Sequence, residues 1–408
     1  MKTTKKLLAV VLAAVMLLCV MPLGVFADEV LTTIPQGVWV AGKRVDSDKE
    51  TYWLNDNGSI TSTNATADNY NVKYTPATET ADANLTLKNA NLSDSVVYKY
   101  GSYDYMSAVV YVYAQKDVNV TITLEGSNAI TAKPELITTG YQSNNYIYGI
   151  KCADSSNRNA SATVIGDGSL EIKAEQNTID DYYSSVAVNG ADALNVAGKA
   201  KVTIDAKVNK VGNQTGYWTG AYAVKILNVS EKATVKATAS SNADLMFIYA
   251  ANSVEVSDKA NVFLSGKYAF ENAEVNGGTF EAIGTTSLSS GTSNDLDLYD
   301  SRRCSVRLNT EATADGAKRW NGDEKKDEDF NFVGEDFTVR VDGYKYIKVK
   351  YYPQPLSTIS LVSQTMWNLF RVFVKYFVSA FINFPIRFYN SIKIIVENIG
   401  DYIDYYNK

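Results

Sequence analysis

Short runs of alternating apolar and polar residues recur along the middle of the chain, and they predict β-strands. Their apolar positions are mostly Val, Ile, Ala and Tyr at a period of two, and polar turns separate the runs. The pattern therefore predicts an all-β fold built from a repeat. Copies of one order of strands and turns occupy 109–130, 146–175, 185–207, 221–240, 247–266 and 268–284.

The tightest copies of this repeat align residue by residue. ALNVAGKAKVTI (193–204) aligns with ILNVSEKATVKA (226–237), and both align with SVEVSDKANVFL (253–264). Successive copies lie about 20–40 residues apart, which suits one coil of a β-solenoid with or without an inserted loop. The anchor positions of the copies are Val112, Ile150, Val188, Val224, Ile248 and Phe270.

Stacking of the repeats is favoured for a physical reason. Each repeat offers short strands with one apolar stripe, which a single repeat cannot bury, whereas stacked coils bury the stripe and pair every strand. A two-sheet sandwich is the alternative, because hairpin-type dipeptides occur at Asn189-Gly190 and Asn276-Gly277. We expect a parallel β-helix over residues 109–310. Its longer loops carry polar and aromatic residues and occupy 138–146, 177–185 and 211–220.

The segments on either side of the repeat predict caps. A solenoid exposes an apolar cross-section at each end, and residues 28–108 contain strand-like runs that we expect to form an N-terminal β cap. Residues 311–355 begin as a charged, turn-rich linker. Within them, 337–352 predicts a β-hairpin around Asp342-Gly343 that closes the other end as a C-terminal cap.

From residue 356 to residue 408 the period changes to that of a helix. Apolar residues recur three and four positions apart, Pro385 interrupts the run, and the opposite face is polar and mostly basic. Such an amphipathic α-helical tail is typical of a helix that lies in a membrane interface. Packing along the solenoid and helix-mediated oligomerisation are the alternatives. The candidate membrane-contact residues are Trp367, Phe370, Arg371, Phe373, Lys375, Phe377, Phe381, Arg387 and Lys393.

Residues 1–27 have the layout of a secretory signal peptide. Three lysines precede an apolar run from Leu7 to Val20, and a small residue, Ala27, stands before Asp28. We therefore expect an exported protein that is secreted or retained at the cell envelope. The formal net charge is −6 and becomes more negative without the three lysines, so we expect no nucleic-acid partner.

Composition limits the chemistry that is open to the chain. Histidine is absent, which excludes an imidazole base and histidine metal sites. Asp180-Asp181 is placed as in an exposed loop, so we assign no catalytic residues. Asp295, Asp297 and Asp300 form an incomplete Ca²⁺-loop pattern and are the only metal ligands that we consider; otherwise we expect no cofactor.

The two cysteines beyond the signal peptide, Cys152 and Cys304, fall in separate parts of the repeat. Strands of neighbouring coils are about 4.8 Å apart, and a disulfide requires Cα atoms within about 7 Å of each other. Because several coils separate these residues, we expect two free, buried thiols.

Loop aromatics are the candidates for ligand contact. The chain has 28 tyrosines, which suit strands but can also stack on the apolar face of a sugar when they are exposed. Loops on one side of a solenoid would form an extended row of such rings, whereas the alternative is that the rings pack against neighbouring coils. The candidate ligand-binding residues are Tyr141, Tyr146, Tyr182, Tyr183, Tyr217 and Trp218.

Several segments resemble secreted Firmicutes (clostridial) carbohydrate-binding-domain or pectate-lyase-like β-helix repeat proteins. They are VWVAGKRV, VKYTPATETADANLTLKNANL, VNVTITLEGSNAIT and ATVIGDGSLEIKAE, within residues 37–285. The resemblance implies a right-handed parallel β-helix with a surface or glycan-related role, and it supplies no catalytic residues. We expect a non-catalytic protein that binds a polysaccharide or host glycan and contacts a membrane surface. A polysaccharide lyase or hydrolase on the same scaffold and a protein-binding adhesin are the alternatives.

Overall fold

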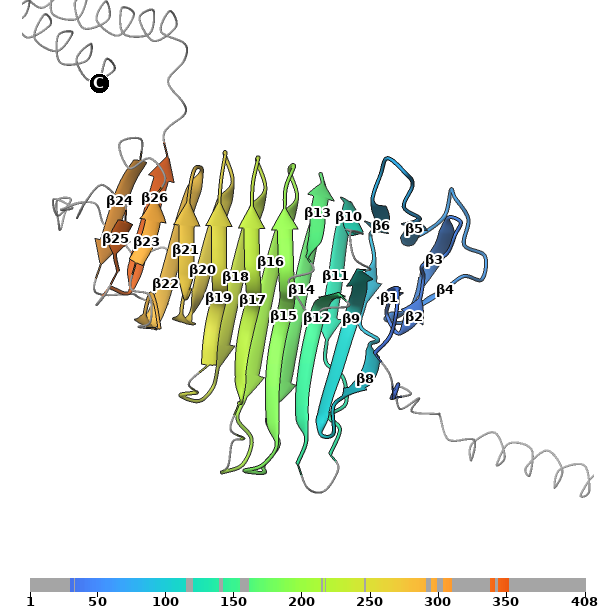
Figure 1. Ribbon diagram of the computed structural model, residues 1–408, viewed down its shortest axis with the longest axis horizontal. Helices are drawn as coiled ribbons and strands as arrows, with labels where there is room; N and C mark the ends of the chain where they lie inside the picture. Colours follow the sequence, from blue (N-terminus) through green and yellow to red (C-terminus); the bar gives the residue numbers. More distant parts are fainter. Residues whose placement is uncertain are drawn as a thin grey trace, which may run out of the picture. The chain divides into compact units, whose positions relative to one another are not determined.

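The structure is a computed structural model of the protein. It describes residues 30–32, 34–114, 120–138, 142–154, 161–213, 216, 218–245, 247–290, 295–298, 304–309, 338–341 and 344–351. In this part of the chain every regular element is a β-strand, and most strands belong to one long, mostly parallel sheet (Figure 1). The all-β prediction is confirmed, and the arrangement is compatible with a β-solenoid.

The longest strands form one ladder of parallel neighbours. Each pairs in register with the next, as in Ile147↔Val188, Val188↔Ala221 and Ala221↔Ile248. Partners on neighbouring coils are 41 residues apart at Ser143–Ser184, 33 at Ser185–Trp218 and 27 at Glu231–Asp258. The coils therefore shorten along the chain. The strands are β9 (Asp104–Ala114), β12 (Asn144–Asp154), β15 (Ser185–Val196), β17 (Gly220–Val229) and β19 (Phe247–Val256).

Two further ladders of parallel strands complete the repeat. The second joins the last residues of β15, β17 and β19, as the pairing of Thr163 with Asn195 shows. It comprises β6 (Ala83–Lys88), β10 (Val120–Glu125), β13 (Ala162–Gly166), β21 (Asn272–Val275) and β23 (Asp295–Leu298). The third comprises β7 (Asn91–Leu92), β11 (Ser127–Ala132), β14 (Ser169–Asn177), β16 (Lys201–Asn209), β18 (Thr234–Ser241), β20 (Asn261–Tyr268) and β22 (Thr279–Ser287).

The alignment of the tight repeats is confirmed as hydrogen-bond register. Ala193 pairs with Ile226, which pairs with Ser253, and Lys201 pairs with Thr234, which pairs with Asn261. The sequence pattern alone thus defined which residues lie beside one another in these coils.

The apolar stripe faces a continuous core along the stack. One column of fully buried residues in the third ladder shows this plainly, and each large aliphatic side chain in it contributes about 1.5–3 kcal/mol through burial. Neighbours in the column are paired across adjacent strands. The column consists of Leu92, Ile130, Ile172, Ile204, Ala237, Leu264 and Ala282.

A second apolar cluster lies on the opposite face of the long strands. On β9 the core takes Val110 and Val112, whereas Tyr111 between them points to the opposite face, as strand alternation requires, and belongs to the second cluster. Ala108 also belongs to the second cluster although Val109 belongs to the core, so the alternation shifts between Val109 and Val110. Tyr98 packs edge-on against Tyr111, with ring centroids 5.5 Å apart. The long strands therefore carry side-chain packing on both faces near the N-terminal end of the stack.

Tight turns join the long strands to the third ladder. Gly198, Glu231 and Asp258 occupy the same position in three successive turns, and all have positive φ, of 72°, 57° and 57°. The Lys232 N–H donates to the Gly198 carbonyl (3.0 Å), and the Lys259 N–H donates to the Glu231 carbonyl (2.8 Å). The turns therefore stack on one another by backbone hydrogen bonds, as the strands do.

Antiparallel strands cover the N-terminal end of the stack. Strands β1 and β8 pair with β9, β5 pairs with β6, β3 pairs with β5, and β3 also pairs with β4. Parallel pairing begins at β6 and β9, so part of the segment 28–108, expected as a cap, already belongs to the first coil. These strands are β1 (Val38–Val40), β2 (Lys43–Arg44), β3 (Thr51–Asp56), β4 (Ser59–Thr61), β5 (Val72–Thr75) and β8 (Val96–Tyr100).

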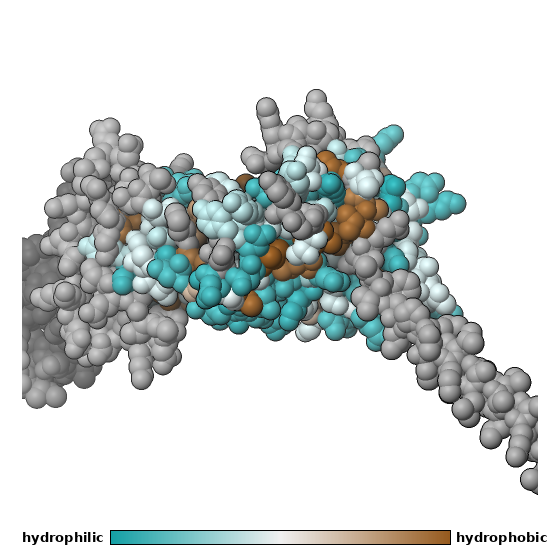
Figure 2. Space-filling view, turned by 90° about the horizontal axis from the view of Figure 1, so that it is seen from below, coloured by the Kyte–Doolittle hydropathy of each residue, from teal (hydrophilic) through white to brown (hydrophobic). Residues whose placement is uncertain are grey.

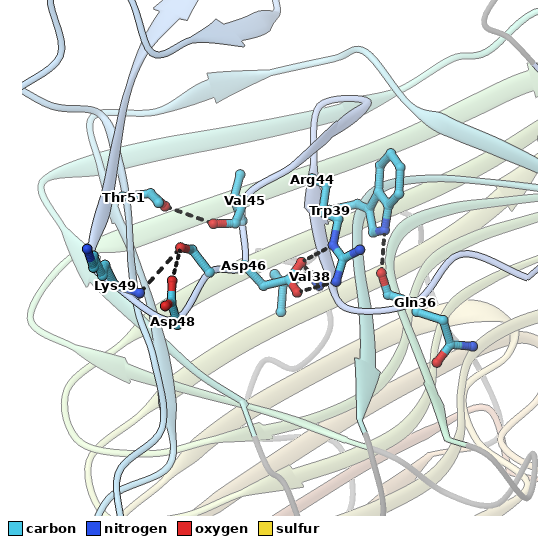
Figure 3. A network of polar contacts seen from close by, with 10 residues as sticks. Gln36, Val38, Trp39, Arg44, Val45, Asp46, Asp48, Lys49 and Thr51 are labelled. Atoms are coloured by element: carbon cyan, nitrogen blue, oxygen red, sulfur yellow. Dashed lines mark hydrogen bonds and ion pairs between the residues drawn. The ribbon is translucent and has the colours of Figure 1, made fainter.

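A carboxylate holds β1 and β2 together in this cap. Asp46 accepts hydrogen bonds from the Val38 backbone N–H and from Nε of Arg44, both at 2.9 Å (Figure 3). Gly37 has φ of 89°, and a Cβ there would lie 2.4 Å from the Asp46 carboxylate oxygens. The position therefore favours glycine both for its backbone conformation and for the close approach.

The C-terminal strands close the stack in a way that differs from the expected hairpin. Strands β25 (Thr338–Arg340) and β26 (Tyr346–Tyr351) lie within the predicted segment 337–352, but β25 pairs with β23, whereas β26 pairs with β22 and with β24 (Cys304–Asn309). All these pairings are antiparallel. The physical reason is that two ladders end here, and each has an open edge that needs its own covering strand.

Cys152 is free and buried, as expected, while the side chain of Cys304 lies outside the described part of the structure. Burial raises the pKa of the Cys152 thiol to about 12. The signal peptide at 1–27 and the helical tail at 356–408, with all its candidate membrane-contact residues, also lie outside the described residues. Within the described part, no helix is long and apolar enough to cross a membrane.

Candidate functional site

The two ends of the long strands differ in the connections that they carry. Short turns follow β15, β17 and β19 at one end, and connections of differing length precede the long strands at the other end, at the lower edge of Figure 1. We call the second end the loop end. Because the long strands are parallel and in register, all the loops that precede them meet there.

Most exposed large hydrophobic side chains of the described residues lie at the loop end. Tyr182 is 58% exposed, Tyr183 64% and Trp218 55%, and all three were ligand-binding candidates from the sequence. Tyr103, immediately before β9, and Val211, in the loop between β16 and β17, are also exposed. Because these exposed side chains concentrate at one end of the strands, we take the loop end as the candidate site.

Loops 178–184 and 210–219 are held together by direct hydrogen bonds. The Val211 N–H donates to Oγ1 of Thr178 (2.9 Å), and the Asn213 N–H donates to Oδ1 of Asp180 (3.0 Å). The Trp218 N–H donates to Oγ of Ser185 (3.0 Å). The two loops therefore continue the coil-to-coil register beyond the ends of the strands.

Trp218 is further positioned by the next coil. Its ring stacks on that of Phe247, with centroids 5.6 Å apart and 29° between the planes. Phe247 is the first residue of β19 and pairs with Gly220. Gly216, in the same loop as Trp218, lies very close to the backbone of Ser184. A side chain does not fit there, because a Cβ at Gly216 would lie 1.6 Å from the Ser184 carbonyl oxygen.

The aromatic residues of the loop end follow the stack from coil to coil. The Asn144 N–H donates to the Tyr103 carbonyl (2.9 Å), and the Ser185 N–H donates to the Ser143 carbonyl (3.1 Å), so each loop is bonded to its neighbour. We call the set of rings so placed the loop-end row. It consists of Tyr103, Tyr182, Tyr183, Trp218 and Phe247.

The remaining sequence candidates have other positions. Tyr146 is half-buried on β12 beside the second apolar cluster, and burial raises the pKa of its phenol. Tyr141 and Tyr217 lie outside the described residues. Viewed from the loop end, apolar atoms form separate small patches among polar and intermediate ones rather than one broad apolar area (Figure 2).

The acid pair Asp180-Asp181 is used inside the loops. Asp180 accepts the Asn213 N–H, and Asp181 accepts both the Tyr183 N–H and the Ser184 hydroxyl at 3.0 Å. These bonds satisfy backbone groups that the loop would otherwise leave unpaired. The two carboxylates therefore fix the conformation of the loops through hydrogen bonds.

A second aromatic feature lies on the outer face of the long strands. Tyr222, Tyr249 and Tyr268 are paired neighbours, and their ring centroids are 5.3 Å and 5.2 Å apart. We call this set the tyrosine ladder. Each ring packs against the ring of the next strand. Burial raises the pKa of the Tyr222 phenol to about 12. These rings stabilise the sheet through their mutual packing.

Charged side chains surround a buried tyrosine next to the ladder. Asp192 forms ion pairs with Lys151 and with Lys225, the latter at 3.6 Å. Nζ of Lys151 and Nζ of Lys225 lie 5.0 Å and 5.4 Å from the centroid of the Tyr148 ring, and Lys225 also donates to its hydroxyl (3.2 Å). Asp192, Lys151 and Lys225 are therefore each paired with an opposite charge, and both lysines also lie near the Tyr148 ring.

The described residues do not test the proposed Ca²⁺ site, because Asp297 is the only one of the three ligands whose side chain they include. Asp295 and Asp297 lie on β23, the side chain of Asp295 and the whole of Asp300 lie outside the described part, and Asp297 pairs with Glu274 and with Thr338. Among the residues that the structure describes, no group of three or more Cys, Asp or Glu side chains is placed to hold a metal ion.

Sequence reasoning missed Tyr103, Val211 and Phe247. Tyr103 stands in a short turn rather than in one of the long loops, and Phe247 opens a strand, so neither fell in a polar loop tract. A usable signal for Tyr103 and Phe247 was their position immediately before or at the start of a long strand, whereas Val211 lay in the predicted loop 211–220 but is not aromatic. No protein-family model, curated protein or solved structure was found to match this chain, so the functional argument rests on its own residues and their geometry.

Proposed function

We propose that this protein is an exported, non-catalytic glycan-binding protein built on a right-handed parallel β-helix, and that its loop end is the binding surface. The observation that carries the proposal is the exposure of Tyr182, Tyr183 and Trp218 on loops that bond to one another in register. A tyrosine or tryptophan ring offers an apolar face and a polar edge, which match the apolar face and the hydroxyls of a sugar.

Rigid placement supports this function. Trp218 is held by Ser185 and by Phe247, and Tyr183 is held through the Asp181 carboxylate. Rings that are already ordered lose little conformational freedom when a ligand binds, so more of the contact energy appears as affinity. The bonded acid pair gives no support to the alternative of a lyase or hydrolase.

Binding to polysaccharides tests the proposal directly. Affinity electrophoresis through gels that contain neutral or acidic polysaccharides should show retardation of the full chain by at least one of them. Trp218→Ala should abolish that retardation, because it removes the ring that two coils position. Phe263→Ala removes a partly exposed ring on β20, far along the coil from the loops, and should leave retardation unchanged.

Three results would contradict the proposal. These are a full chain that is not retarded by any polysaccharide, equal retardation of both variants, and release of shortened or unsaturated sugars during incubation. The last result would favour the enzyme alternative instead.

The location of the protein and the role of its tail are parts of the same proposal. We propose that the signal peptide directs export and that the helical segment 356–408 contacts the membrane surface, which would keep the glycan-binding stack at the cell envelope. Co-sedimentation with anionic liposomes should retain the full chain and lose a chain that ends at Leu356. Equal partitioning of both would reject the membrane contact.

A further inference from the structure

The loop-end row is oriented across the coils rather than along a strand. Tyr103, Tyr182 with Tyr183, Trp218 and Phe247 each precede or open a long strand, and those strands are successive neighbours in the ladder except for β12. Neighbouring coils are about 4.8 Å apart. A ligand that touches the whole row must therefore be long and extended in the direction of the stack.

The charges nearest the rings along the chain are carboxylates that are already bonded, whereas Lys210 lies further from Trp218 in its loop and Lys267 pairs with Asp244. Asp104 follows Tyr103 and accepts from Nδ2 of Asn144 (2.8 Å), and Asp180 and Asp181 accept from loop backbone groups. An anionic polymer would bring like charge to these carboxylates, which is unfavourable at short range. A ligand without charge meets no such penalty.

Between the rings of the row, three serines hold neighbouring loops together. The Ser143 hydroxyl donates to that of Ser184 (3.3 Å), the Ser185 N–H donates to the Ser143 carbonyl, and Oγ of Ser185 accepts the Trp218 N–H. All three serines are buried, so they support the loops and leave contact with a ligand to the exposed rings.

The tyrosine ladder provides a contrast within the same molecule. Tyr222 and Tyr249 are only 5° from parallel with centroids 5.3 Å apart, so each covers a face of the other. Tyr182 and Tyr183 meet edge to face at 88° and stay more than half exposed. The rings of the loop end therefore keep a large exposed fraction, even though Trp218 stacks on Phe247, whereas the rings of the tyrosine ladder are stacked against one another and are not among the exposed large hydrophobic residues.

We propose that the loop-end row binds a linear, neutral polysaccharide that lies along the stack axis and contacts several coils at once. This inference rests on the proposed glycan-binding function and adds the class, shape and direction of the ligand. Its consequence is that affinity grows with ligand length, because each further sugar unit reaches the ring of another coil.

Calorimetry with a length series of neutral β-linked gluco-oligosaccharides, from two to six units, tests the inference. The dissociation constant should fall by about tenfold or more from the shortest to the longest oligosaccharide. An oligomer of galacturonic acid of the same length should bind at least about tenfold more weakly. The screen is repeated with neutral xylo- and manno-oligosaccharides, and any one neutral series that meets both criteria supports the inference.

Single-ring variants locate the ligand. Tyr103→Ala should leave the affinity for the shortest bound oligosaccharide unchanged and remove much of the gain for longer ones, because Tyr103 lies two coils from β15. Trp218→Ala should weaken binding at every length. Phe263→Ala is the matched control and should bind as the unchanged protein does, and circular dichroism confirms that all variants fold.

The outcomes separate this inference from the function on which it rests. Binding without length dependence, tighter binding of the uronic-acid oligomer, or an unaltered length dependence in Tyr103→Ala would overturn the inference and leave glycan binding standing. Failure of every oligosaccharide and polysaccharide to bind would overturn both. A protein partner captured at the loop end in the absence of any glycan binding would also overturn both.

Discussion

The long strands have one end with short turns, which we call the turn end, and the loop end at the other side. The two ends differ in how their connections are held together. At the turn end, the three turns that follow β15, β17 and β19 have equal length, share a positive-φ position at Gly198, Glu231 and Asp258, and bond to one another through their backbones. At the loop end, connections differ in length, and the side chains of Thr178, Asp180 and Ser185 bond loops 178–184 and 210–219 to each other.

The difference shows where this fold can vary. A turn whose backbone continues the ladder has little freedom, since each changed residue disturbs the hydrogen bonds of two coils. A loop that is tied by side chains can change in length and composition while the strands keep their register. The exposed rings lie at the end that has this freedom.

The largest effect is expected from Gly166→Ala, which adds a methyl group at the turn end. Gly166 has φ of 108°, and a Cβ there would lie 2.4 Å from the Leu124 carbonyl. Backbone strain and the clash together should lower the free energy of unfolding by about 3 kcal/mol. Urea denaturation followed by circular dichroism measures this loss.

Gly198→Ala is the matched control. Gly198 has φ of 72°, but the nearest atom to a Cβ added there would be 3.7 Å away, so only the left-handed backbone is penalised, by about 1 kcal/mol. Equal losses in the two variants would show that crowding between coils does not limit the turn end.

Alkaline pH should lower the stability of the protein through Cys152, which lies on the long strand β12. The pKa of the Cys152 thiol is raised by burial from 9.0 to about 12, so the folded state keeps its proton where the unfolded chain loses it. This contribution is complete below pH 9 and is lost as the pH rises towards 12, with a loss of about 1.4 kcal/mol at about pH 10. Denaturation at several pH values measures it.

The Cys152→Ala variant provides the reference for this prediction. It lacks the titrating group, so its stability should fall less steeply between pH 9 and pH 12, whatever constant loss the smaller side chain causes. Identical slopes for the variant and the unchanged protein would show that the thiol does not titrate in this way.

Removing one carboxylate at each end should distinguish an effect on the stability of the fold from an effect on polysaccharide binding. Glu231 at the turn end accepts the Gly198 N–H (3.0 Å), and Asp181 at the loop end accepts the Tyr183 N–H (3.0 Å). Glu231→Ala and Asp181→Ala should each cost about 1 kcal/mol of stability. Only Asp181→Ala should weaken polysaccharide binding, because it releases the loop that carries Tyr182 and Tyr183.

Urea denaturation and affinity electrophoresis on the same two proteins measure both quantities. Retained binding in Asp181→Ala would show that loop order does not contribute to the site, and weakened binding in Glu231→Ala would show that the two ends are coupled.

The smallest effect is expected from lengthening a loop. Two glycines inserted between Ala243 and Asp244, before β19, should cost about 0.6 kcal/mol or less, because the entropy of closing a loop grows slowly with its length. The same insertion between Glu231 and Lys232 should cost clearly more, since it interrupts the stacked turns. A loss above about 2 kcal/mol at the loop would mean that both ends are equally constrained.

Much of the stack could be predicted from the sequence because the signal is local. The period of two identified the strands, and the repeated ILNV-type segment gave the pairing of Ala193 with Ile226 and Ser253. The expectation that Cys152 would be free and buried followed from the same register and is confirmed. These features depend on neighbours in the chain and on repetition, both of which a single sequence shows.

The boundaries of the stack were harder to predict. Strand β6 looks like any alternating strand, and only its partner, β10, shows that it begins the parallel ladder. Strands β25 and β26 were expected to pair with each other, but each covers a different ladder. Partner choice at an edge depends on which strand is left unpaired there, and this is a property of the assembled sheet.

By itself the sequence determined the strands, their register in the tight repeats and the positions of the turns, because these follow from a side-chain period and from repetition. Only the tertiary structure decided which aromatic rings face solvent. Tyr182 and Tyr222 are both tyrosines close to long strands, yet the first is exposed and the second is packed against Tyr249. Exposure of a ring depends on what the next coil places beside it, and that neighbour is far away in the chain, from 19 residues for Tyr249 and Tyr268 to 41 for Ser143 and Ser184.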